Sequence, residues 1–183
     1  MGADKIFLKL GGRTLLDRTL AIAKSVTHDV LIVGDQTKLA GLANVIEDLY
    51  PNCGPLGGIH AALTNSTAEL NLMLAVDLPF LETRFLEYLL SAARRSKAAV
   101  TVPRADGGFQ PLCAVYRRRR FAELAERALH AGNNKIDQLF VPADTRVLEE
   151  DELKRAGFSA EMFRNVNTPE EWEQAKSAAH LKS

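Results

Sequence analysis

Short apolar runs that alternate with helical patterns are the feature of this sequence that most limits its fold. Three runs, Val30–Val33, Leu72–Val76 and Ala98–Val102, carry apolar side chains at consecutive positions. Strands of this kind are typical of a parallel sheet that is covered by helices on both faces. Between them, apolar residues recur at helical spacing over 15–26 and 81–93. The alternation predicts βαβ units in a doubly wound α/β sandwich with a mostly parallel sheet.

Length and charge limit the classes of partner. The 183 residues suit one domain, residues 1–183, with a single core. Lysine plus arginine equals aspartate plus glutamate at 23 each, so no net positive field draws the chain to nucleic acid or to an anionic membrane. No apolar run reaches the roughly 18 residues of a membrane-spanning helix, and no signal-peptide core opens the sequence. We therefore expect a cytoplasmic protein with small-molecule or protein partners.

The cysteines and histidines form no cluster in the sequence. Cys53 and Cys113 are far apart and have no neighbouring cysteine or histidine at the spacing of a zinc site. We expect both to be reduced thiols. We expect the four histidines at the surface or at helix ends.

Two segments in the second half have more than one interpretation. Ala105–Gly108 predicts a turn, which belongs either to a hairpin or to a longer excursion. The basic run Arg117–Arg120 opens a helical pattern and forms either a solvated helix face or a contact with phosphate.

Two glycine-containing segments suit phosphate or nucleoside binding. Met1–Lys5 combines a small residue, an acid and a lysine in one tight turn. Either Lys5 is a point charge on a nucleotide's phosphates, or the segment is an ordinary surface turn. Gly54–Gly58 precedes a helical pattern, and its glycines permit a close approach of the backbone to a ligand at the start of a helix. A purely structural turn would explain the same glycines.

Acidic residues stand at the ends of two expected strands. Asp77 follows Leu72–Val76 and precedes Pro79, which places a carboxylate at the edge where open α/β sheets bind ligands. There it either binds Mg²⁺ between nucleotide phosphates or caps the helical segment from Leu81. Asp48 ends a strand-like segment and, on sequence alone, is a surface acid of the loop that follows.

Five blocks in one order carry a family resemblance. They are Met1–Lys5, Asn52–Ile59, Ala75–Phe80, Gln110–Tyr116 and Phe163–Glu171. Together they closely resemble the molybdenum cofactor guanylyltransferases, within the nucleotide-sugar-type nucleotidyltransferases, over nearly the whole chain. The resemblance implies a Rossmann-like three-layer sandwich and a Mg²⁺-dependent enzyme. The implied reaction transfers GMP from GTP to molybdopterin, or to the molybdenum cofactor, and releases pyrophosphate.

The resemblance also implies roles for individual residues. The implied catalytic residues are Lys5 and Asp77, with Asp77 as the Mg²⁺ ligand. The implied GTP-binding residues are Lys5, Asp48, Gly57, Gly58 and Asp77. The implied molybdopterin-binding residues are Gln110, Asn165 and Asn167. Asn165 and Asn167 alternate along an extended segment, so both amides can face the donor and acceptor edge of a pterin, although Asn167 is also placed to cap a helix predicted from Thr168.

The sequence departs from the family pattern in two places. The family opens with an apolar strand and a Leu-Ala-Gly-Gly-x-Ser-x-Arg loop, and neither precedes Met1 here. In the family's architecture their absence would leave strands without ladder partners and the triphosphate without a backbone cradle. We therefore expect a marginally stable chain that binds GTP poorly. Gly34 stands where the family often places an asparagine near the nucleoside, so that contact is either absent or supplied by Asp35.

Two other functions stay open. One is a related nucleotidyltransferase, such as a molybdopterin cytidylyltransferase or a sugar-phosphate enzyme, although Asn165 and Asn167 disfavour the sugar enzymes. The other is a catalytically impaired adaptor that binds the cofactor without the phosphate loop. The resemblance implies GTP and molybdopterin or molybdenum cofactor as ligands, and molybdenum insertion proteins and molybdoenzyme chaperones as protein partners.

Overall fold

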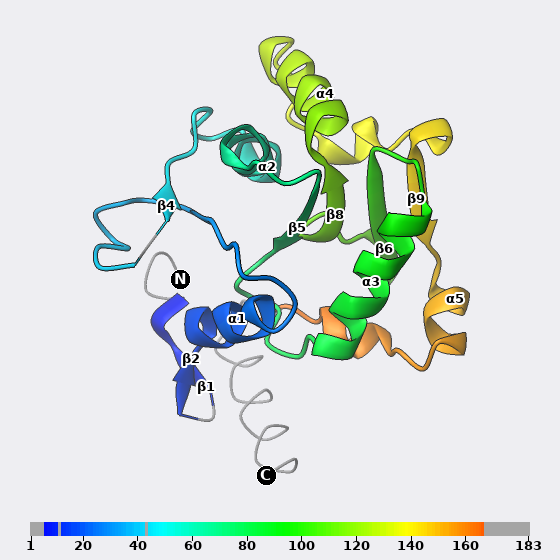
Figure 1. The fold of residues 1–183 in the computed structure, drawn as a ribbon, viewed down its shortest axis with the longest axis horizontal. Coiled ribbons are helices and arrows are strands. Elements are labelled where there is room, and N and C mark those ends of the chain that lie inside the picture. Colours follow the sequence, from blue (N-terminus) through cyan, green and yellow to red (C-terminus); the bar gives the residue numbers. More distant parts are fainter. Residues whose placement is uncertain (1–5, 11, 43, 167–183) are drawn as a thin grey trace.

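The computed structural model describes residues 6–10, 12–42 and 44–166, and their elements form layers around a central sheet (Figure 1). Helices α2 (Gly54–Asn65) and α4 (Arg118–His130) pack together on one face of this sheet. Helix α3 (Thr83–Arg95) covers the other face. This arrangement confirms the expected α/β sandwich.

Strand β8 (Cys113–Arg117) shows how the core forms on both faces of the sheet. Successive side chains of a strand point to opposite faces. Ala114 and Tyr116 join the apolar cluster beneath α2 and α4, whereas Cys113 and Val115 join the cluster beneath α3. All four side chains are buried, so this continuous apolar run is a strand that is covered on both sides.

The central sheet is mixed in its described part, where the sequence predicts mostly parallel strands. Its order is β5 (Leu70–Leu74), β8, β6 (Val100–Ala105) and β7 (Gly108–Phe109), and β9 (Thr145–Leu148) pairs with β6. β9 is parallel to β6, but β8 is antiparallel to both β5 and β6. The cause is the turn at Asp106 and Gly107, which both have positive φ. This hairpin returns the chain antiparallel, whereas a helical crossover would keep it parallel.

Strand ends differ from those expected. β5 stops at Leu74, so Ala75 and Val76 lie in the segment that leads to Asp77. In the expected strand 30–33, only β3 (Ile32–Val33) is paired, in parallel with β4 (Val45–Ile46). β5 is half-buried at every position, and within the described residues its edge away from β8 has no ladder partner.

The remaining elements surround this sheet. Helix α1 (Leu15–Lys24) follows a hairpin of β1 (Lys9–Leu10) and β2 (Arg13–Thr14), and Thr14 and Asp17 form a reciprocal capping box at its start. The others are α5 (Glu150–Arg155) and 3₁₀ turns at Ile136–Leu139, Pro142–Asp144 and Ala160–Phe163. The helix predicted from Thr168 lies outside the described residues. Among the helices that are described, none is both long and apolar enough to cross a membrane.

Two arginines of the basic run 117–120 donate hydrogen bonds to backbone carbonyl groups. Neither interpretation of the sequence predicted this role. Arg117 donates to the carbonyl of Ser96 at 2.6 Å, and Arg118 donates to the carbonyl of Ser66 at 2.9 Å. Ser96 and Ser66 are the C-caps of α3 and α2. Carbonyl groups at helix C-termini lack partners inside the helix, so these two guanidinium groups satisfy them.

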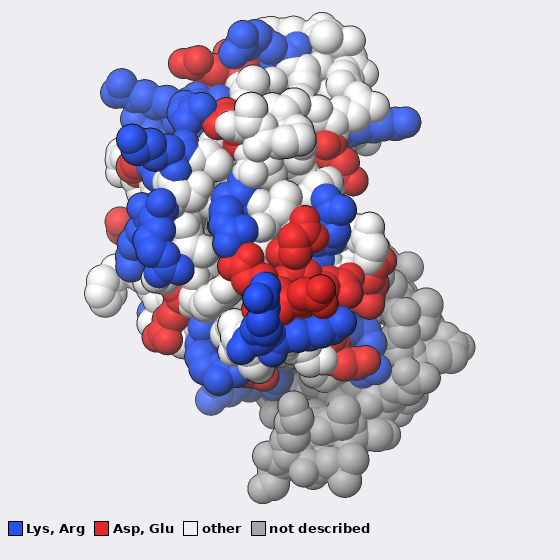
Figure 2. All heavy atoms as spheres, turned by 90° about the vertical axis from the view of Figure 1, so that its right-hand side faces the viewer, with Lys and Arg blue, Asp and Glu red and all other residues white. Residues whose placement is uncertain are grey.

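Charges are mixed on the face that carries α5. Figure 2 shows acidic side chains gathered there with basic side chains around them. Glu152 pairs with Arg146 at 2.6 Å, and Glu149 lies 3.6 Å from Arg104. Neighbouring charges of opposite sign cancel at a distance, so this face presents no extended field of one sign.

Candidate active site

Asp77 lies beyond the carboxyl end of β5, beside a segment from the far end of the described chain. The N–H of Ala75 donates to the carbonyl of Leu112 at 2.7 Å, which extends the β5–β8 pairing by one bond. The N–H of Val166 donates to the carbonyl of Asp77 at 3.2 Å. Asn165 precedes Val166 and is exposed. The structure therefore brings two predicted site residues, Asp77 and Asn165, into adjacent segments.

An aromatic ring and a guanidinium join these two segments. The guanidinium carbon of Arg164 lies 4.9 Å from the centre of the Phe80 ring, and Arg164 is 3.8 Å from Glu161. Phe80 packs against a small core cluster that includes Leu10 and Val166. Sequence reasoning missed Arg164, because the residue that holds it lies more than 80 positions earlier. One signal was present in the sequence: Phe80 and Arg164 both belong to the blocks that carry the family resemblance.

Asp48 lies against the first turn of α2. Its Oδ1 accepts a hydrogen bond from the N–H of Tyr50 at 2.8 Å. A Cβ added to Gly57 would stand 2.7 Å from Asp48 Oδ2 and 2.8 Å from the Tyr50 carbonyl oxygen. Gly57 is therefore glycine because the loop and the helix approach so closely. A carboxylate at a helix N-terminus is stabilised by the helix dipole, and α2 has no acidic side chain in its own first turn.

The other glycines of this turn have different constraints. Gly54 has a φ of +62°, a conformation that side chains disfavour. Gly58 has room, since its nearest neighbour would be Val33 Cγ1 at 3.8 Å. Of the glycines predicted at the nucleotide, Gly57 is therefore the one that the packing of the protein itself requires.

An aromatic cluster anchors the Asp48 loop, and the sequence did not indicate it. The hydroxyl of Tyr50 lies 3.0 Å from His130 Nε2, at the end of α4. The Tyr50 ring packs edge-on against His60 at 5.3 Å between centroids. His60 is buried in the middle of α2, which corrects the expectation that it lies at the surface or at a helix end, and its Nδ1 has no partner in the described part of the chain. No sequence signal links Tyr50 to His130, because their contact depends on the packing of α2 against α4.

Gln110 lies at the same end of the sheet as Asp77. It comes two residues before Leu112, whose carbonyl binds Ala75. Its side-chain Nε2 donates to the carbonyl of Ala105 at 3.4 Å, so its amide is engaged with the β6–β7 turn. The position fits the predicted pocket, and the role in binding stays a prediction.

Three further predictions concern Lys5, Asn167 and Asp35. Lys5 and Asn167 lie outside the described residues. The carboxylate of Asp35 accepts the N–H groups of Thr37 and Lys38 at 2.9 and 3.1 Å. Oδ1 of Asp35 therefore stabilises its own turn, and its role as a substitute for the family's nucleoside asparagine stays a prediction.

The acidic side chains near Asp77 limit the kind of Mg²⁺ site that can form there. No group of three or more histidine, cysteine, aspartate or glutamate side chains that could hold a metal occurs in the described residues. Mg²⁺ in nucleotide sites is held by one or two carboxylates together with water and substrate phosphates. A single carboxylate at the end of β5 fits that kind of site and does not fit an all-protein cage.

Comparison with known proteins agrees with this geometry. The model of the MobA-like NTP transferase domain matches residues 1–150. A molybdenum cofactor guanylyltransferase from Desulfosudis oleivorans is 35% identical over 179 residues, which cover 97% of this chain and 88% of that protein. A probable molybdenum cofactor guanylyltransferase from Natronomonas pharaonis is 31% identical, with coverage of 94% and 88%.

Solved structures confirm the fold. Molybdopterin-guanine dinucleotide biosynthesis protein A from Archaeoglobus fulgidus superposes with a TM-score of 0.80 at 26% identity, covering 97% of this chain and 91% of that one. A 2-C-methyl-D-erythritol 4-phosphate cytidylyltransferase from Thermus thermophilus gives 0.69 at 18% identity, with coverage of 98% and 95%, and shows the fold alone. The expected nucleotidyltransferase fold is thus confirmed, and the chain belongs to the family of MobA-like NTP transferases.

Proposed function

We propose that this chain transfers GMP from GTP to the terminal phosphate of molybdopterin or of its molybdenum-loaded form. The names of the relatives support this reaction. One observation carries the proposal: the hydrogen bond from Val166 to Asp77 sets Asn165 beside the segment with the metal-binding candidate. The segments that carry a carboxylate for the phosphates and an amide for a heterocycle thereby become neighbours.

The reaction replaces the phosphoanhydride bond between the α- and β-phosphates of GTP with one between the α-phosphate and the acceptor phosphate. A phosphate oxygen of the acceptor forms a bond to the α-phosphorus of GTP. The bond from the α-phosphorus to the bridging oxygen breaks, and pyrophosphate leaves with that electron pair. No enzyme group needs to bond covalently, so catalysis rests on positioning and on neutralising charge.

The candidate residues have different parts in this proposal. Asp48 accepts hydrogen bonds from guanine or ribose donors, and the close packing on Gly57 fixes the position of its carboxylate. Asp77 would hold Mg²⁺, which supplies positive charge to the phosphates when it is bound. Arg164 is held on the Phe80 ring and adds positive charge near the acceptor side. Lys5 is proposed as a further charge on the triphosphate.

The metal role is tested by Asp77→Asn, with Asp29→Asn as the matched control. Asp29 lies in the exposed segment before β3, away from the carboxyl ends of the strands. With α-labelled GTP, molybdopterin and Mg²⁺, we expect Asp77→Asn to lower product formation by about 100-fold or more, and Asp29→Asn to leave it unchanged. Equal turnover and equal Mg²⁺ dependence in the two variants would refute the assignment.

The acceptor side is tested by calorimetry on Asn165→Ala and on Asn165→Ala combined with Asn167→Ala. The double variant removes two to four hydrogen bonds at about 0.5 to 1.5 kcal/mol each, so molybdopterin binding should weaken more than GTP binding. The opposite order would show that these amides serve the nucleotide.

The same assay separates the two alternative functions. Turnover with CTP in place of GTP would identify a cytidylyltransferase. Tight molybdopterin binding by the unaltered chain, without turnover of any nucleotide, would identify an adaptor.

A further inference from the structure

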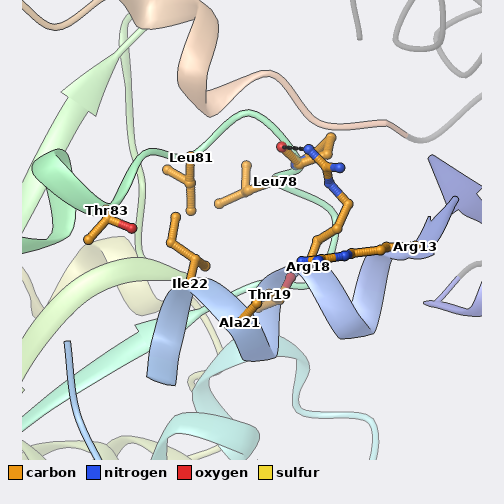
Figure 3. A pocket seen from close by; sticks show the side chains of 9 residues that line it. Arg13, Arg18, Thr19, Ala21, Ile22, Leu78, Leu81 and Thr83 are labelled. Carbon is orange, nitrogen blue, oxygen red and sulfur yellow. Dashed lines mark hydrogen bonds between the residues drawn. The ribbon is translucent and has the colours of Figure 1, made fainter. Parts of the chain in front are cut away.

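A cavity of about 350 Å³ lies between α1 and the segment that follows Asp77. Figure 3 shows Arg13 and Arg18 toward one end, with Ile22 and Leu81 toward the other and Leu78 between them. The GTP half of the proposed site, Asp48 and Gly57, contributes no residue to the lining of this cavity.

Within the described part of the chain, the basic end of the cavity has no counter-charge. Arg18 donates through Nη1 to the carbonyl of Leu10 at 3.3 Å and through Nη2 to that of Pro79 at 3.5 Å, the bond drawn in Figure 3. Its Nε is buried and has no hydrogen-bond partner within the described part of the chain. Among the described residues neither Arg13 nor Arg18 forms an ion pair, and no acidic side chain lines the cavity.

An unpaired buried donor on a cation is costly, and an anion close to the guanidinium reduces that cost. Guanidinium groups suit a carboxylate or a phosphate, because their donors form a planar fork that matches two oxygens. The rest of the cavity is different in character, since Ile22, Leu78 and Leu81 offer apolar surface. A ligand that matches this cavity has an oxyanion for the arginine end and a short apolar group for the apolar end.

We propose that this cavity binds a small organic oxyanion, a carboxylate or a phosphate monoester with an apolar group of a few carbons. The oxyanion pairs with the guanidinium groups of Arg13 and Arg18, and the apolar group lies on Ile22 and Leu81. This site goes beyond the proposed transfer reaction and does not depend on it.

The ligand would also contact the loop that carries Asp77. Leu78 directly follows Asp77, and Arg18 holds the carbonyl of Pro79 by a long hydrogen bond. An oxyanion competes with this carbonyl for the guanidinium, because charged acceptors form the stronger hydrogen bonds. Binding in the cavity is thereby linked to the position of the Asp77 loop.

The test is calorimetric titration of the whole chain with butyl phosphate, hexanoate and inorganic phosphate, without nucleotide. We expect butyl phosphate or hexanoate to bind about tenfold or more tightly than inorganic phosphate, because only they bury apolar groups. The better of these two probes identifies the oxyanion. Arg13→Gln and Arg18→Gln should each weaken that probe by about tenfold, while Arg119→Gln, on the exposed side of α4, should not.

The proposal is overturned if neither organic probe binds, or if Arg13→Gln binds the better probe as tightly as Arg119→Gln. Arg13 is exposed and makes no described contact that folding needs, so its variant decides the outcome even if Arg18→Gln unfolds. Because no GTP is present, failure of the transfer reaction leaves this result unaffected.

Discussion

Gly57 and Gly58 adjoin in the sequence, yet we expect opposite effects when each becomes alanine. A Cβ on Gly57 would overlap Asp48 and the Tyr50 carbonyl, and overpacking of this kind costs about 1 to 3 kcal/mol. A Cβ on Gly58 fits, and alanine is favoured over glycine in a helix by up to about 1 kcal/mol. Thermal melting should fall for Gly57→Ala and rise for Gly58→Ala. A common direction would contradict the close approach of Asp48 to α2.

We expect the hydroxyl contact of Tyr50 to hold the loop that carries Asp48. Tyr88 provides a matched control, because its hydroxyl makes a comparable contact elsewhere. Tyr50→Phe removes the contact with His130, and Tyr88→Phe removes a 2.9 Å hydrogen bond to Glu152 far from the site. Each variant should lose about 0.5 to 1.5 kcal/mol of stability. Only Tyr50→Phe should raise the KM for GTP, with kcat unchanged. A KM that responds equally in both variants would mean that the effect is general destabilisation.

The two thiols should differ in reactivity. Cys113 is fully buried, and this burial raises the pKa of its thiol well above the ordinary value. Cys53 is partly exposed. Since the thiolate is the reactive form, a thiol reagent at pH 8 should label Cys53 in the native protein and both cysteines in denaturant. Rapid native labelling of Cys113 would show that the sheet opens near β8.

Sequence reasoning singled out the candidate acids and amides, but it did not single out the residues that pack around them. Asp77 stands out because it follows an apolar strand, and Asn165 stands out because it lies in the motif block Phe163–Glu171. Arg164 and His60 do not, because each is defined by a ring that approaches from another part of the chain. The glycine-rich turn was visible in the sequence, but only the packing on Asp48 separates Gly57 from Gly58.

At the level of elements, Glu152 ties α5 to β9 and α3 and makes this junction sensitive to acid. Burial alone would raise the pKa of Glu152, but hydrogen bonds from Arg146 and Tyr88 outweigh it and lower the pKa. Because the pKa of Glu152 is lower in the folded state, its ionised carboxylate stabilises the fold. This stabilisation is fully present above the pKa of the unfolded state, about 4.3, and is lost as the pH falls through the pKa of the folded state.

Denaturant unfolding of Glu152→Gln should therefore show a deficit in stability at pH 7 that shrinks below about pH 4. Glu126→Gln, on the exposed face of α4, serves as the control and should match the unaltered chain at both pH values. A deficit in Glu152→Gln that persists unchanged at low pH would show that the carboxylate charge is not the cause.

Helical periodicity and apolar runs predicted the existence of the main elements but not their pairing. α3 begins at Thr83, and its buried residues Phe85, Leu86 and Leu89 follow the expected spacing. The direction of β8 was open, because the same apolar run fits a parallel or an antiparallel strand. The positive φ values at Asp106 and Gly107 decide it, and a sequence shows such a turn only as one of several options.

For the molecule as a whole, we expect stability to depend on the edge of β5 that has no ladder partner among the described residues. β5 carries no charged residue, although edge strands in soluble proteins are generally protected by charges or bulges. We expect that an added strand would stabilise the fold. A version extended at its N-terminus by an apolar strand and a glycine-rich loop should melt higher, bind GTP more tightly and associate less than the 183-residue chain.

The control carries an extension of the same composition in scrambled order. Gains that appear equally with the scrambled extension would mean that length or solubility, and not strand pairing, is responsible. If the 183-residue chain melts as high and binds GTP as tightly as the ordered extension, the edge of β5 needs no further strand.

The pairing of β5 with β8 also limits when β5 can fold during synthesis, because β8 is synthesised later. Leu70–Leu74 find their partners about 40 residues later in the chain, at Cys113–Arg117. A ribosome that adds about 5 to 20 residues per second needs some seconds to produce that stretch. During this interval α3 can already form from local contacts, whereas β5, which carries no charged residue, has not yet paired with β8. The vulnerable moment of this protein therefore falls during its synthesis, and slower translation between the two strands would lengthen it.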